Sequence, residues 1–252
     1  MDKRPICKLA LADGMVFVGK AFGAMGTSGG EVVFNTAMSG YQEVLTDPSY
    51  SGQIVTMTYP QIGNIGVNPD DVESYDRRVQ VGGFVVRDLS PRVSNFRATQ
   101  AMEDYLAEAG VMGIAQIDTR ALTRHLRVAG ATNGVLSTEI DDPAELVAKA
   151  RELPSMAGMN LVKNVTPAEA YAWDAGFATE FDPPSRIAAD AKRYRVVAID
   201  CGVKTSILRN LVMAGCDLQV VPADTPAEEI LEYKPDGVFV SNGPGDPAAV
   251  TA

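Results

Sequence analysis

The sequence predicts an α/β protein in which an N-terminal mixed β/α domain precedes the first half of a doubly wound domain. Over residues 1–152, short β-rich runs mix irregularly with a few helical segments. From residue 195 onward, apolar strands alternate regularly with helices, a pattern typical of a parallel sheet covered on both faces. We therefore expect one domain at residues 1–152, a connector at 153–194 and a partial α/β domain at 195–252.

The composition is that of an ordinary soluble globular protein, with 46% hydrophobic and 21% charged residues among 252. The formal charge of -10 repels phosphate backbones, so we expect no nucleic-acid partner. No uninterrupted apolar run approaches the roughly 20 residues that a bilayer requires, and the N-terminal residues lack a signal-peptide core. We expect a cytoplasmic protein that does not associate with membranes.

The strands of the first domain are predicted from β-rich runs and turn residues. Residues 7–11 and 15–18 flank Asp13-Gly14, a turn pair whose glycine accepts positive φ, which predicts a hairpin. Three further β-rich runs follow, at residues 31–34, 54–57 and 79–86.

Two helices are predicted in the same domain. Residues 99–108 are apolar at helical spacing, and Gly110 follows as a natural helix end. Asp118 is a candidate N-cap for a second helix, which ends before Gly130.

The connector and the C-terminal domain differ in their patterns. Periodicity weakens over 153–194, where prolines punctuate the chain and predict a surface connector. Strands are predicted at 196–199, 218–221 and 237–240, with a helix at 206–214 and another after 225. The second helix is predicted to begin with a capping box formed by Thr225, Pro226 and Glu228.

The loop after the last predicted strand, Ser241-Asn242-Gly243-Pro244-Gly245-Asp246-Pro247, is the most informative segment. In open α/β sheets, ligands bind beyond the carboxyl ends of the strands, where this loop lies. Gly243 and Gly245 leave backbone N–H groups uncovered, so the loop can direct donors at a developing negative charge, as an oxyanion hole does. The alternative is a tight turn built from turn-forming residues.

The glycine loop resembles the oxyanion loop of class I glutamine amidotransferases. Other motifs resemble the small subunit of carbamoyl phosphate synthase, and together they span nearly the whole chain. These motifs are Gly30-Glu31-Val32-Val33-Phe34-Asn35-Thr36, Gly40-Tyr41-Gln42-Glu43, Thr46-Asp47-Pro48-Ser49-Tyr50-Ser51, Tyr59-Pro60-Gln61-Ile62-Gly63-Asn64, Arg87-Asp88-Leu89, Ser94-Asn95-Phe96-Arg97, Ile117-Asp118-Thr119-Arg120 and Asp200-Cys201-Gly202-Val203-Lys204.

This resemblance implies that the C-terminal part begins a flavodoxin-like amidotransferase domain. The intact protein would supply ammonia from L-glutamine to a large synthetase subunit, an ATP-dependent ligase that makes carbamoyl phosphate from bicarbonate for arginine and pyrimidine biosynthesis. The two chains would form a heterodimer. ATP and Mg²⁺ would bind to the large subunit, and no cofactor is expected on this chain.

The resemblance also places glutamine binding on Ser49, Gly243 and Gly245. Ser49 has an alternative role as a turn residue after Pro48. In the family, the nucleophilic cysteine lies at a strand-to-helix elbow downstream of the glycine loop. This sequence ends before that elbow, so we expect no catalytic residue in this chain and no activity from the chain alone.

The three cysteines and the single histidine are candidates for other chemistry. Cys201 ends a strand before a helix, but it lies upstream of the glycine loop, where the family usually has an aromatic residue. Cys216 follows a helix C-terminus, whose dipole disfavours a thiolate. His125 is expected to be a surface residue of its helix, and nothing pairs it with a cysteine. Three cysteines, an odd number, with one histidine favour neither a disulfide framework nor a metal site.

Two rival functions are weighed against this one, and the match to the first fails at two positions. The run Gly202-Val203-Lys204-Thr205 between a strand and a helix suggests a phosphate-binding loop, but Val203 separates glycine from lysine and Val197 occupies the place of the earlier glycine. The second rival is a non-catalytic module that docks to the large synthetase subunit.

Overall fold

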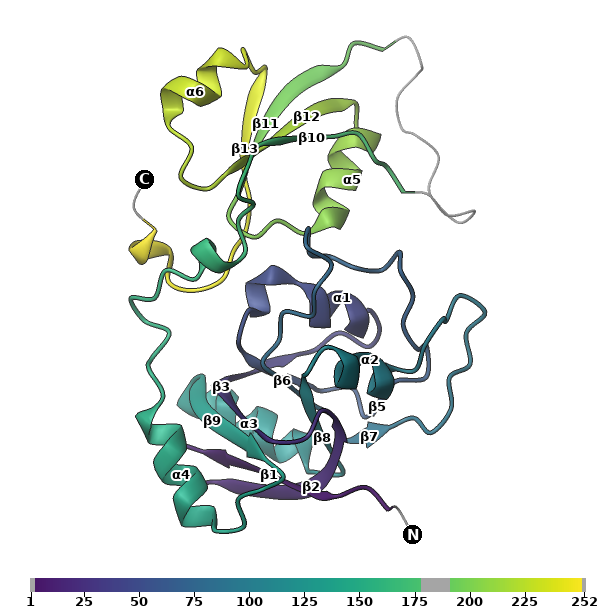
Figure 1. The fold of residues 1–252 in the computed structure, drawn as a ribbon, viewed down its shortest axis with the longest axis vertical. Helices are drawn as coiled ribbons and strands as arrows, with labels where there is room; N and C mark the ends of the chain where they lie inside the picture. The colour runs from purple at the N-terminus through teal and green to yellow at the C-terminus, as the bar shows by residue number, and fades with distance from the viewer. Residues whose placement is uncertain (1–2, 178–190, 251–252) are drawn as a thin grey trace. The chain divides into compact units, whose positions relative to one another are not determined.

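The computed structural model describes residues 3–177 and 191–250, which form two compact units (Figure 1). The described residues of Met1–Val72 and Arg78–Met156 form the first unit. Those of Glu73–Arg77 and Ala157–Ala252 form the second. None of the described helices is long and apolar enough to cross a bilayer.

A closed barrel forms the first unit, with the strand order β1-β2-β8-β6-β4-β3-β9. The pairs β3–β4, β4–β6 and β6–β8 are parallel. The pairs β1–β2, β1–β9, β2–β8 and β3–β9 are antiparallel, so the barrel is mixed. The short strands β5 (Gln61–Ile62) and β7 (Asp88–Leu89) pair separately. The barrel strands are β1 (Ile6–Leu11), β2 (Val16–Gly23), β3 (Thr27–Asn35), β4 (Ile54–Met57), β6 (Gly83–Val85), β8 (Met112–Ala115) and β9 (Thr132–Ser137).

The predicted hairpin is confirmed. β1 and β2 pair antiparallel, the Leu11 amide donates to the Met15 carbonyl at 2.8 Å, and Gly14 has φ 103°. The run predicted at 79–86 is a strand only over β6, because the amides of Gln80 and Gly82 donate to the carbonyls of Leu45 and Gln53, which lie outside the strands.

Both predicted helices of the first unit are present, as α2 (Met102–Glu108) and α3 (Thr119–Ala129). The Asp118 carboxylate accepts from the Ala121 amide at 2.9 Å, as expected of an N-cap. Sequence reasoning missed α1 (Tyr41–Thr46) and α4 (Pro143–Glu152). The pair Asp142-Pro143, an N-cap followed by proline at the first helical position, was a usable signal for α4.

The second unit contains a sheet with the order β10-β12-β11-β13. The predicted parallel core is confirmed, since β11 (Tyr194–Asp200) runs parallel to both β12 (Cys216–Pro222) and β13 (Gly237–Val240). A strand inside the predicted 153–194 connector, β10 (Tyr171–Trp173), extends this sheet by pairing antiparallel with β12. That segment therefore does more than connect two domains.

Helices lie on both faces of this sheet, as the doubly wound prediction requires. On one face, Leu208 of α5 (Thr205–Met213) packs with Ala198 and Val220. On the other face, Ile230 of α6 (Ala227–Glu232) packs with Val197 and Val221. Alternate residues of β11 and β12 thus point to opposite layers, which explains why these two strands are apolar on both faces.

The predicted capping box of α6 is wrong, although the helix is present. The N-cap position is Pro226, with no side-chain cap, and the Thr225 hydroxyl donates instead to the Pro222 carbonyl at 2.8 Å. The helix begins one residue later than predicted because the threonine closes the preceding turn.

A distant segment caps α5, whose own N-cap residue, Lys204, provides no side-chain acceptor. The Glu73 carboxylate accepts from the Ser206 amide at 2.8 Å, and the Glu73 carbonyl accepts from the Thr205 amide at 2.9 Å. The Lys204 ammonium lies 3.8 Å from the same carboxylate. These contacts place Glu73–Arg77 in the second unit.

Replacement of Leu122 by alanine should destabilise the first unit. Leu122 is fully buried against the barrel, so Leu122→Ala should lower the free energy of unfolding by about 2–5 kcal/mol. Val128→Ala on the same helix is the control, because Val128 is 89% exposed and should change it by less than about 0.5 kcal/mol. Urea denaturation measures both, and equal effects would contradict the packing of α3.

Candidate functional site

The glycine loop leaves the sheet beside the loop that follows β11. Because β11 and β13 are parallel neighbours, both loops emerge at the carboxyl edge of the sheet. The Ser241 amide donates to the Ile199 carbonyl at 3.1 Å, and the Ser241 hydroxyl accepts from the Cys201 amide at 2.9 Å. The start of the glycine loop is therefore tied to β11 and to the residue that follows it.

Gly243 is required by a close approach between two backbones. A Cβ atom at Gly243 would lie 2.1 Å from the Cys201 carbonyl oxygen, a distance that no side chain can occupy. The Asn242 side chain donates to the Gly202 carbonyl at 3.4 Å from the same side of the loop. Only glycine lets the loop lie this close to Cys201.

Gly245 is required by both its conformation and its neighbours. Its φ is +84°, which L side chains rarely adopt. A Cβ atom there would also lie 2.5 Å from the Met159 carbonyl oxygen and 3.0 Å from the Leu161 nitrogen. The loop is thus enclosed on a second side by residues 159–161.

Two amides of the loop remain available to a ligand. Ser241 and Asp246 donate their amides to backbone carbonyls, at 3.1 and 3.0 Å. Within the part of the chain that the structure describes, the amides of Gly243 and Gly245 make no such bond. Gly243 is exposed and Gly245 is half-buried, so a ligand can approach the Gly243 amide from solvent.

Ser49 belongs to the first unit, and the two glycines belong to the second. It is the central residue of the short helix η1 (Pro48–Tyr50), where its amide donates to the Asp47 carboxylate at 2.8 Å. The backbone of Ser49 therefore lies in a turn after Pro48, as its alternative role as a turn residue predicts. The glutamine-binding roles of Ser49, Gly243 and Gly245 remain predictions.

None of the three cysteines is an activated nucleophile. Burial raises the pKa of the Cys7 thiol to about 12. Burial also raises the pKa of Cys201, and the neighbouring Asp200 carboxylate adds to that effect. Burial raises the pKa of Cys216 as well, against the lowering influence of Arg193. An activated cysteine nucleophile has a lowered pKa, and each of these three thiols is shifted in the opposite direction.

The single histidine is paired with a carboxylate in the first unit. His125 Nε2 contacts Asp13 Oδ2 in the turn of the β1–β2 hairpin, so the ring joins α3 to that hairpin. Burial alone would raise the pKa of the Asp13 carboxyl. Hydrogen bonds from the Met15 amide and from His125 outweigh that effect and hold the pKa below its usual value. This pair has a structural role of its own.

The loop after β11 does not have the open amides of a phosphate-binding loop. The Asp200 carboxylate accepts from the amides of Gly202 and Val203, both at 2.7 Å. Glu73 occupies the next amides, at the start of α5. The Asp200 carboxylate and the carbonyl and carboxylate of Glu73 therefore already accept from the amides that would bind a phosphate, which argues against the rival nucleotide-binding function.

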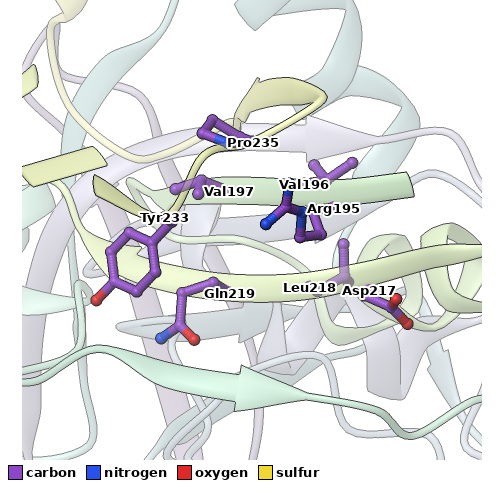
Figure 2. A pocket seen from close by; sticks show the side chains of 8 residues that line it. All are labelled: Arg195, Val196, Val197, Asp217, Leu218, Gln219, Tyr233 and Pro235. Atoms are coloured by element: carbon purple, nitrogen blue, oxygen red, sulfur yellow. The ribbon is translucent and has the colours of Figure 1, made fainter. Parts of the chain in front are cut away.

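A pocket of about 210 Å³ lies elsewhere on the same sheet (Figure 2). It includes Arg195 and Val196, at the start of β11, together with Asp217 near the start of β12 and Tyr233 after α6. These residues mark the amino ends of the strands, opposite to the glycine loop. The pocket is therefore separate from the predicted site.

A polar pocket of about 350 Å³ in the first unit joins two motifs that the sequence singled out. Arg87 and Asp88 line it together with Gln116, Ile117 and Asp118. The Gln116 amide donates to the Arg87 carbonyl at 2.7 Å, which brings the two segments together. The sequence alone does not indicate that these two motifs lie together.

Comparison with known proteins matches the two units to two family models. Residues 9–136 match the model described as "Carbamoyl-phosphate synthase small chain, CPSase domain". Residues 197–252 match the model described as "Glutamine amidotransferase class-I", which includes the glycine loop.

Similar proteins are named carbamoyl phosphate synthase small chain. The one from Syntrophotalea carbinolica is 55% identical over 96% of this chain, which spans 64% of that protein's length. The one from a Nostoc species is 56% identical over 96% of this chain and 62% of its own length. The one from Nitratidesulfovibrio vulgaris is 52% identical, with 96% and 65% covered. The chain thus spans a little less than two thirds of these relatives.

Alanine at Gly245 should strain the loop in two ways. Gly245→Ala should lower the free energy of unfolding of the second unit by about 2–4 kcal/mol, since positive φ and a clash with Met159 both act. Gly110→Ala is the control, because Gly110 has φ +71° but nothing near its Cβ position, and should cost about 1–2 kcal/mol. Denaturation curves compare them, and equal costs would contradict the close approach.

The cysteines should react slowly with alkylating agents in the folded protein. Raised pKa values leave little thiolate near pH 7.5, and for Cys7 a rise from 9.0 to about 12 lowers the thiolate fraction roughly a thousandfold. Each rate should increase with pH and on unfolding. Mass spectrometry after iodoacetamide pulses measures this. A cysteine that reacts faster than free cysteine would restore the nucleophile hypothesis.

Proposed function

The chain belongs to the family of carbamoyl phosphate synthase small chains, and from this membership we propose that the protein is the glutamine-hydrolysing subunit of a carbamoyl phosphate synthase. It supplies ammonia from L-glutamine to a large synthetase chain, its partner in a heterodimer. That partner binds ATP and Mg²⁺ and forms carbamoyl phosphate from bicarbonate. The reaction serves arginine and pyrimidine biosynthesis in the cytoplasm.

The observation that carries this proposal is the pair of open amides at Gly243 and Gly245. Attack of a thiolate on the glutamine carboxamide makes a tetrahedral intermediate, whose oxygen becomes negative. Backbone N–H groups fixed around that oxygen stabilise it without having to reorganise during the reaction. A loop held by backbone packing on two sides suits this task, because its donors are already oriented.

A second candidate function, docking without catalysis, is favoured for residues 1–252 by the state of the cysteines. Each thiol has a raised pKa, so this part of the protein contributes oxyanion donors and a binding surface but no nucleophile. Both functions are compatible, since the same chain can dock to the synthetase and complete a glutaminase site with a cysteine from elsewhere.

The complete gene product, combined with the large synthetase chain, should form carbamoyl phosphate from glutamine. Gly245→Val should lower kcat for glutamine hydrolysis by about 100-fold or more, as expected when oxyanion donors are misplaced. Gly110→Ala, far from the loop in sequence, should retain activity. Unchanged glutamine affinity and turnover in Gly245→Val would contradict the assigned role.

Residues 1–252 alone should not hydrolyse glutamine, even with the large chain present, because no activated thiol is available within them. Ammonia release measures this directly. Turnover that Cys201→Ser abolishes would overturn the expectation.

A further inference from the structure

Asp246 connects the glycine loop to a segment far earlier in the chain. One oxygen of its carboxylate accepts from the Gly158 amide at 2.9 Å, and the other accepts from the Ala248 amide at 2.9 Å. Its own amide donates to the Met159 carbonyl at 3.0 Å. The bond to Ala248 makes Asp246 the N-cap of the short helix η3 (Pro247–Ala249), whereas the bond to Gly158 reaches outside that helix.

We call residues 158–161 the strap. The strap fixes the residue directly before Asp246, since the Met159 carbonyl and the Leu161 nitrogen occupy the space where a Gly245 side chain would be. On the opposite side of the loop, the Cys201 carbonyl lies against Gly243. Both open amides therefore lie in a stretch of chain that is anchored at Ser241 and at Asp246.

The ionisation of Asp246 is consistent with this connection. Hydrogen bonds from the Gly158 and Ala248 amides hold the pKa of Asp246 below its usual value. The carboxylate is therefore charged at neutral pH and accepts through both oxygens.

The strap has a buried polar atom that its own packing does not satisfy. Asn160 Oδ1 is buried and has no hydrogen-bond partner within the described residues. Such atoms cost free energy, so each one in a folded protein calls for an explanation.

The strap also lies between the two matched segments, 9–136 and 197–252, so neither family model includes it.

We propose that the strap is a positioning element of the oxyanion site, and that Asp246 is the positioning residue that orients the amides of Gly243 and Gly245 through it. This proposal rests on the proposed function. Backbone donors act only when they point at the developing charge, and a misplacement of about 1 Å can cost on the order of 100-fold in rate. Asp246 supplies that orientation without touching glutamine.

The test is Asp246→Asn in the complete gene product with the large synthetase chain. The two donors face different oxygens of Asp246, so asparagine in the same rotamer directs its NH2 group at one of them, either the Gly158 amide or the Ala248 amide. The kcat for glutamine hydrolysis should fall about 10- to 100-fold, because misoriented amides stabilise the transition state less. KM should change less than about threefold, because the amides contribute little to binding of the ground state.

Asp142→Asn is the matched control. Asp142 also precedes a proline, caps a helix and accepts from the amide two residues later, Ala144, at 2.9 Å, but it belongs to the first unit. Its substitution should leave kcat and KM unchanged. If Asp246→Asn does not fold, Asp246→Ser replaces it, because serine can still cap Ala248 but is too short to reach Gly158.

Amide hydrogen exchange provides a readout that does not need activity. A peptide covering residues 241–248 should exchange faster in Asp246→Asn than in the unsubstituted protein or in Asp142→Asn. Unchanged exchange, or an unchanged kcat, would overturn the role of the strap. Absence of glutamine hydrolysis in the unsubstituted complex would instead overturn the proposed function, so the two failures are distinguishable.

Discussion

The close packing of backbone against backbone around the glycine loop is the constraint on which the candidate site depends. At Gly243 the neighbour is the Cys201 carbonyl, and at Gly245 it is the Met159 carbonyl. No side chain fits at either place, so the spacing of the two glycines follows from the tertiary contacts as much as from local turn chemistry. The same packing keeps the donors of the loop in a fixed orientation, which is what electrostatic stabilisation of an oxyanion requires.

Carboxylates in the second unit accept hydrogen bonds from backbone amides around the site. Asp200 accepts from the turn after β11, Glu73 accepts from the start of α5, and Asp246 accepts from Gly158 and Ala248. These bonds close the positions that could otherwise attract an anion at the carboxyl edge of the sheet. The amides of Gly243 and Gly245, in contrast, make no hydrogen bond to a backbone carbonyl among the described residues. A developing negative charge is therefore favoured at this one loop and not along the whole edge of the sheet.

The sequence and the structure agree best where a local signal acts alone. The Asp13-Gly14 hairpin and the Asp118 cap depend on residues within a few positions, and both were predicted correctly. The predicted capping box at Thr225 was wrong because the Thr225 hydroxyl bonds to the Pro222 carbonyl, which is as near in sequence as the predicted partner Glu228. The barrel of the first unit was not predicted, since its closure depends on pairing β1 with β9, more than a hundred residues apart.

The sequence by itself determined the family, the parallel strands of the second unit and the identity of the glycine loop, because these depend on motifs and on periodicity along the chain. Only the tertiary structure decided which amides are open, that Glu73 caps α5 and that Asp246 reaches Gly158. Such contacts join residues about 90 to 130 positions apart, where no local pattern predicts the partner. The physical reason is that a hydrogen bond depends on distance and direction in space, which the order of residues alone does not specify.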